Sequence, residues 1–94
     1  MHISALTLEL HLPGCLSLKE KRGRIKPLLA GLHRQYNVSA AEVDRQDSHT
    51  ECVVACVIVS SDGPHVDRVL AKLPGWIEHR FPDVMVVDQH VITL

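Results

Sequence analysis

The residues in this sequence most able to do chemistry are basic side chains at the start of a predicted helix. An alternating apolar run ends at Pro13-Gly14, and the helix begins at Ser17. Because the first N–H groups of a helix have no partner within it, nearby cations complete a site for phosphate or sulfate. The same cations oppose the helix dipole and lower its stability, so we interpret them as functional candidates. The basic side chains of these turns are Lys19, Lys21, Arg22, Arg24 and Lys26.

A solvated helix surface is the alternative interpretation of these charges. At about 100° per residue, Lys19 and Lys26 fall on one side of the helix, whereas the other charges spread around its axis. Ion pairs within the helix, such as Glu20–Arg24, add only tenths of a kcal/mol. We retain both interpretations, and the candidate anion- or nucleic-acid-binding residues are Lys19, Lys21, Arg22 and Lys26.

Histidine and carboxylate side chains form a second candidate site. Glu9 and His11 share one face of the first predicted strand, and Asp88 and His90 join them if the first and last strands pair. None of the seven histidines forms an H-x-x-x-H pair or joins a cysteine at zinc spacing. A hydrogen-bonded structural cluster is therefore favoured over a metal or acid–base site, and we expect no metal there.

Cys15, Cys52 and Cys56 are the three cysteines. Their odd number, without metal-ligand spacing, argues against a disulfide framework and for reduced thiols in the cytoplasm. Cys52 and Cys56 lie too far apart along one strand for an easy disulfide, so we interpret them as small core residues. We expect neither metal nor cofactor.

Enzyme motifs are scarce. The sequence contains no nucleophile elbow, P-loop or H-E-x-x-H. An acylphosphatase-like hydrolase is a weak alternative, because Arg22 follows the first strand but the Gly-rich loop and a matching Asn are missing. We expect a binding protein rather than an enzyme.

Apolar periodicity predicts the elements that position these residues. Residues 3 to 12 alternate as a strand whose leucines, from Leu6 to Leu12, share one face. Ile3 and Ala5 are out of phase with that row, which predicts a bulge or change of face near Ala5.

The first helix begins with a capping box. Ser17 and Glu20 have the S-x-x-E spacing, and Asn37 is a plausible terminator. Pro27 removes one intrahelical hydrogen bond, but the apolar stripe keeps its phase across it, so we predict one kinked helix. That stripe consists of Leu18, Ile25, Leu29, Leu32 and Tyr36.

The second half of the chain repeats this order. A short strand near residues 38 to 44 precedes the run from Cys52 to Val59, which is apolar on both faces, as in a central strand. Asp62 caps the next helix, and Pro74-Gly75 predicts a kink or local break within it. Residues 84 to 94 form the last strand.

The order βαββαβ predicts a ferredoxin-like α+β domain over residues 1–94, with a four-stranded antiparallel sheet and two helices on one face. Because the central strand is apolar on its uncovered face, we predict a homodimer through the sheet face or edge. The N-terminal run lacks a positive n-region, and no stretch reaches the length of a membrane span. We therefore expect a cytoplasmic protein without a membrane partner.

Charge excludes a general polycation. The formal net charge is −1, with 10 Lys and Arg against 11 Asp and Glu. The charges are unevenly distributed, because residues 17–34 are basic apart from Glu20 whereas residues 42–51 are mostly acidic.

Four segments resemble one family: LTLELHLPG, SLKEKRGRIKPLL, NVSAAEVDRQD and VSSDGPHVDRVL. Together they resemble the YlxP-like family of small bacterial proteins, a domain-of-unknown-function family. The resemblance implies a ferredoxin-like fold without an established activity. The family's genes often lie beside those for translation initiation and ribosome maturation factors, which suggests an RNA or ribosome setting.

The function expected from these observations is that of an RNA- or ribosome-associated accessory factor, which binds phosphate through the basic helix start. The sequence argues against base stacking on the sheet, because the first and third strands contain no aromatic residue. The alternative is a dimeric regulatory domain that binds a small molecule.

Overall fold

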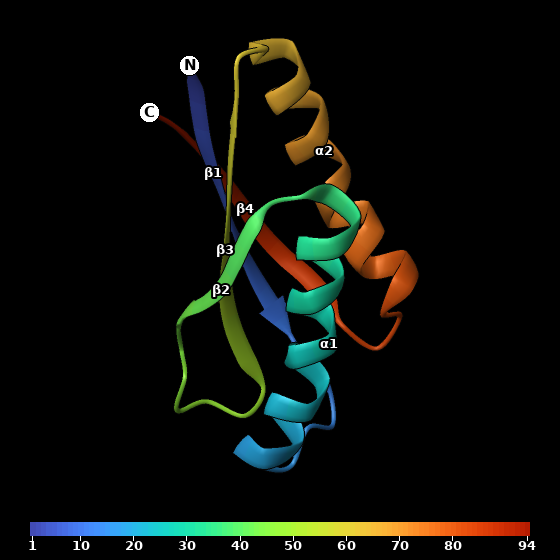
Figure 1. Ribbon diagram of the computed structural model, residues 1–94. Helices are drawn as coiled ribbons and strands as arrows, with labels where there is room; N and C mark the ends of the chain where they lie inside the picture. The colour runs from blue at the N-terminus through green and yellow to red at the C-terminus, as the bar shows by residue number, and fades with distance from the viewer.

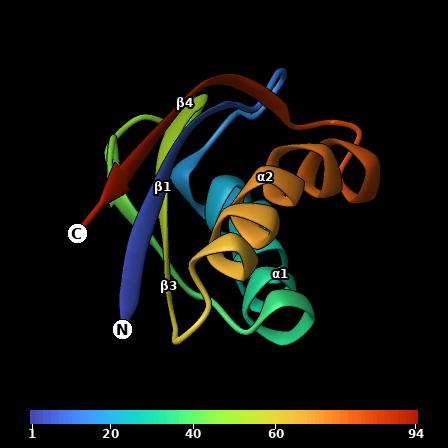
Figure 2. The same ribbon diagram turned by 90° about the horizontal axis from the view of Figure 1, so that it is seen from above.

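The fold is described by a computed structural model of residues 1–94. Its elements are β1 (His2–His11), α1 (Leu18–Tyr36), β2 (Ser39–Asp44), β3 (Glu51–Ser60), α2 (Gly63–Arg80) and β4 (Met85–Thr93). The sheet order is β2-β3-β1-β4, and every neighbouring pair is antiparallel. Both helices pack on one face of the sheet, and the other face is open (Figures 1 and 2). The predicted ferredoxin-like fold is confirmed.

Strand β1 alternates between the two faces along its whole length. Its leucine row is buried beneath the helices, and Ile3 and Ala5 lie on the open face. The prediction of a bulge or change of face near Ala5 is wrong, because β1 alternates regularly and its pairing with β3 is continuous from His2 to His11. A register shift occurs instead between Glu9 and Leu10 in the pairing with β4. It depends on the partner strand, which the sequence of β1 does not reveal.

Helix α1 begins and ends as its sequence predicts. Ser17 Oγ accepts a hydrogen bond from the N–H of Glu20 (3.1 Å), and Glu20 Oε2 accepts from the N–H of Leu16 (2.9 Å). Asn37 ends the helix with φ 53° in the left-handed region. The helix is continuous across Pro27. A single helix is therefore confirmed.

Helix α2 is also continuous. Asp62 Oδ1 accepts from the N–H of His65 (3.1 Å), and Pro64 occupies the first turn, where its missing donor costs no bond. No break occurs at Pro74-Gly75. Buried side chains on both sides of Pro74 anchor the two halves to the sheet: Val66, Leu70, Leu73 and Ile77.

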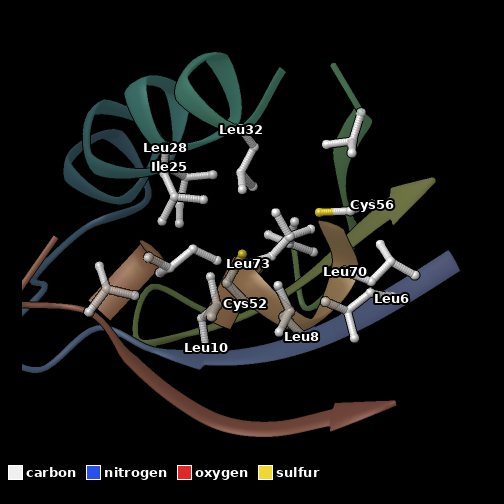
Figure 3. Close-up of a cluster of buried hydrophobic side chains, with 14 of the residues drawn as sticks. Leu6, Leu8, Leu10, Ile25, Leu28, Leu32, Cys52, Cys56, Leu70 and Leu73 are labelled. Carbon is white, nitrogen blue, oxygen red and sulfur yellow. The ribbon is translucent and has the colours of Figure 1, made fainter. Parts of the chain in front are cut away.

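The core lies between the helices and the covered face of the sheet (Figure 3). It contains 18 buried apolar residues, almost all aliphatic, and includes all three cysteines. Cys52 and Cys56 are therefore confirmed as core residues. No helix is long and apolar enough to cross a membrane.

Candidate anion-binding surface on the helices

Lys21 is turned into the protein rather than toward solvent. Its side chain is 2% exposed, because position 21 shares the inner face of α1 with Ile25 and Leu28. Nζ lies 2.7 Å from Glu42 Oε2 and donates hydrogen bonds to the carbonyl oxygens of Arg45 (2.7 Å) and Ser48 (2.5 Å).

Two donors of the ammonium group are used by backbone oxygens, and its charge is paired with Glu42. Because Lys21 is also buried, it is not placed to meet an external anion, contrary to its inclusion among the candidate binding residues. Its contacts instead join the first turns of α1 to β2 and to the turn before β3.

Cys52 and Cys56 are buried thiols of β3, and only Cys52 lies near Glu42 and Lys21. Burial, reinforced by the neighbouring Glu42 carboxylate and opposed by Lys21, raises the pKa of Cys52 to about 12. Burial alone raises the pKa of Cys56 to about 11. Because the thiolate is the nucleophile, neither cysteine is suited to catalysis near neutral pH.

The other three candidates lie on the surface. Lys19, Arg22 and Lys26 are exposed, and none of them makes an ion pair. Their spacing of three and four residues places them within an arc of about 60° on the helix. Arg34, also exposed and unpaired, extends this group toward the C-terminal end of α1. We call these four residues the basic line: Lys19, Arg22, Lys26 and Arg34.

Arg34 is not among the residues predicted from the sequence, because it lies in the last turn of α1 rather than in the basic first turns. Helical periodicity could have identified Arg34, because position 34 lies about 60° from Lys19 around the axis, on the outer side of the helix.

Arg24 has a structural role. Its Nη2 lies 3.1 Å from Asp83 Oδ2 and donates to the backbone oxygen of Asp83 at 2.7 Å. This contact connects α1 to the loop after α2. The expected Glu20–Arg24 pair does not form, because Glu20 caps the helix start instead.

Charge is segregated between the helices and the rest of the molecule. Nine of the ten Lys and Arg residues lie in α1 and α2, together with only three of the eleven Asp and Glu residues. The helices therefore carry a formal charge of +6, and the sheet and loops carry −7. The helices and the rest of the chain therefore carry opposite formal charges, and two ion pairs, Lys21–Glu42 and Arg24–Asp83, join them.

The polar cluster on the open face is assembled in part. Strands β1 and β4 pair, and Glu9, Asp88 and His90 line one hollow, whereas His11 Nδ1 pairs instead with Glu51 Oε1 of β3 at 2.9 Å. Glu9 lies opposite Asp88, and Arg45 approaches Glu9 at 3.6 Å. No three His, Cys, Asp or Glu side chains converge to hold a metal ion. The two ion pairs, His11–Glu51 and Glu9–Arg45, are structural contacts between elements of the fold.

Residues 3–91 match the family described as "Protein of unknown function (DUF503)". The chain belongs to DUF503. It is 31% identical over 68 residues to the uncharacterized protein YlxP of Bacillus subtilis (strain 168). The aligned region covers 72% of this chain and 73% of that protein. The resemblance inferred from sequence is confirmed.

Two solved structures share the fold with this DUF503 chain. One is a mutant of SnoaB, a cofactor-independent oxygenase from Streptomyces nogalater, with a TM-score of 0.59 and 16% identity over 98% of this chain and 92% of that one. The other is the de novo designed protein Foldit4, with a TM-score of 0.55 and 16% identity over 100% and 97% of the two chains. At this identity the likeness establishes architecture alone, since one fold serves many functions.

Proposed function

We propose that the protein is an RNA- or ribosome-associated accessory factor that contacts phosphates through Lys19, Arg22 and Lys26. The observation that carries this proposal is the segregation of charge, with +6 on the helices. Phosphate contacts by Lys and Arg supply most of the sequence-independent affinity for nucleic acid.

The charge distribution favours one binding orientation. The sheet and loops are negative, so a polyanion is repelled from them and attracted to the helices. This accounts for how a protein of net charge −1 binds RNA without behaving as a general polycation.

The anion is held by side chains on the flank of α1 rather than by the helix end itself. Ser17 Oγ already accepts from the N–H of Glu20, and the Glu20 carboxylate lies at the same end. This carboxylate repels a phosphate at the end of the helix. Lys19, Arg22 and Lys26 have no such competing partner.

The test is RNA and ribosome binding across a salt series. The variant Arg22→Gln/Lys26→Gln removes two phosphate contacts, so the slope of log affinity against log salt should become shallower by about 1.4 for single-stranded RNA. Ribosome co-sedimentation should fall in parallel.

The matched control is Arg68→Gln/Lys72→Gln, which removes two exposed charges from α2. Its slope should change by less than half as much, because these residues lie on the other helix. Equal losses in both variants, or no loss in either, would reject α1 as the binding surface.

A second candidate, a dimeric regulatory domain that binds a small molecule, is favoured by one end of the open face. Strand register places five apolar residues side by side there, and Val59 and Ile92 are 61% and 45% exposed. We call this the open-face patch: Ile3, Ala5, Val57, Val59 and Ile92. A thermal-shift screen of nucleotides, amino acids and phosphates tests this candidate, because a ligand specific for the folded state raises Tm.

A further inference from the structure

All three aromatic residues of the chain gather where the two helices meet. The Trp76 ring packs edge-on between Tyr36 and Phe81, with centroid separations of 5.8 Å to each. Gly31 makes this approach possible, since a Cβ added there would lie 2.6 Å from Trp76 Cη2. The Trp76 ring is thus fixed against the backbone of α1.

A hollow of about 290 Å³ lies beside this ring. Arg34 from α1 and Arg80 from α2 line it, and neither makes an ion pair or a hydrogen bond. The guanidinium carbon of Arg80 lies 5.5 Å from the Phe81 ring centroid, as in a cation–π contact. No acidic residue lines the hollow; its other lining residues include Pro27, Gln35, Trp76 and Phe81.

We infer that this hollow binds an unpaired nucleobase together with its phosphate. Unpaired bases stack on aromatic side chains and on guanidinium planes, and arginine also binds phosphate. The amide of Gln35 supplies both a donor and an acceptor for a base edge. The volume lies at the lower end of the range for ligand sites, which suits one nucleotide rather than a larger molecule.

The inference rests on the proposed function and extends it from phosphate contact to base contact. Arg34 belongs both to the hollow and to the basic line. Along α1 it lies about 12 Å from Lys26, so a strand that follows the basic line reaches the hollow. The helices thereby supply the aromatic platform that the strands lack.

Intrinsic fluorescence gives a direct test, because Trp76 is the only tryptophan. We expect saturable quenching when single-stranded octaadenylate RNA is added to the full chain. Adenosine monophosphate should also quench, with at least ten-fold weaker affinity, because it does not reach the rest of the basic line. Equal affinities would identify a free nucleotide, rather than RNA, as the source of the base.

Inorganic polyphosphate is the control without bases, and it should leave the fluorescence unchanged. Quenching by polyphosphate equal to that by RNA would overturn the inference, because charge alone would then explain the signal.

Variants separate base binding from general phosphate binding. Arg34→Gln/Arg80→Gln changes two exposed residues, and it should weaken quenching by adenosine monophosphate at least ten-fold. Arg68→Gln/Lys72→Gln, which leaves the hollow intact, should change it less than two-fold. Circular dichroism confirms that both variants are folded.

Binding of fluorescently labelled RNA, followed by anisotropy, distinguishes the two proposals. If labelled RNA binds, as shown by a rise in anisotropy, but Trp76 emission does not change, the nucleobase site is rejected and the proposed phosphate surface is retained. Quenching by adenosine monophosphate without binding of labelled RNA would support the nucleobase site and reject the RNA-binding function.

Discussion

Lys21 illustrates how a single basic residue is diverted from surface chemistry to fold stability. Its three acceptors come from Glu42, Arg45 and Ser48, which lie more than twenty residues away in sequence. The local pattern around position 21 resembles that of the exposed lysines beside it. Only the docking of β2 and the following turn against α1 reveals the difference.

Replacing Lys21 should destabilise the protein strongly. In Lys21→Met, the Glu42 carboxylate and two carbonyl groups lose a cationic partner, so the free energy of unfolding should fall by about 3 kcal/mol. Urea unfolding measures this change. The same substitution at exposed Lys26 should change it by less than about 0.5 kcal/mol, and an equal effect at both positions would contradict the buried role.

Cys52 and Cys56 should make stability decline at alkaline pH. Folding raises the pKa of Cys52 from 9.0 to about 12 and that of Cys56 to about 11. The unfolded thiols ionise above pH 9 while the folded ones remain protonated, so the contribution of these thiols to stability is fully present below pH 9 and declines as pH rises toward 11.

Urea unfolding at pH 8 and pH 10.5 measures this decline. The variant Cys52→Ala/Cys56→Ala starts from a lower stability but should lose less between the two pH values. A parallel decline in both proteins would show that other groups cause it.

At the scale of elements, the helices were predictable because their signals are local. The capping box, the apolar stripes and Asn37 act within a few residues of where they occur. Pro27 and Pro74 did not break their helices, because each stripe continues in phase on both sides of the proline. The bulge of the β1–β4 pair was not predictable, since register is a property of two strands.

The end of α1 offers a test at this scale. Asn37 adopts φ 53°, a conformation that costs a residue with a side chain about 1 kcal/mol unless it is Asn, Asp or Gly. Asn37→Ala should therefore lower the free energy of unfolding by about 1 kcal/mol, whereas Asn37→Gly should preserve it. A loss of equal size in both variants would point to the Asn side chain rather than to the backbone.

At the scale of the whole molecule, the open-face patch predicts self-association. Apolar residues at the exposures of Val57, Val59 and Ile92 favour a second apolar surface over water. Sedimentation at micromolar concentration should detect a dimer, and Val59→Lys should shift it toward monomer. A wild-type chain that remains monomeric at every concentration tested would reject this interface.

The separation of charge between the helices and the rest of the chain was only partly visible in the sequence. The basic segment and the acidic segment were evident, but the packing of both basic helices on one face of the sheet is a tertiary property (Figure 2). The hollow beside Trp76 was not visible at all. Its residues come from two helices separated by two strands, and only tertiary packing brings Gly31 against Trp76.

This separation of charge also governs how the protein behaves in concentrated solution. Near its isoelectric point of about 6.6, the molecule has no net charge, but its helices remain positive and the rest of the chain remains negative. Such molecules attract one another head to tail when little electrolyte is present, and dissolved ions weaken that attraction within about 10 Å at 0.1 M. Purification in dilute buffer should therefore lead to precipitation, which modest sodium chloride reverses.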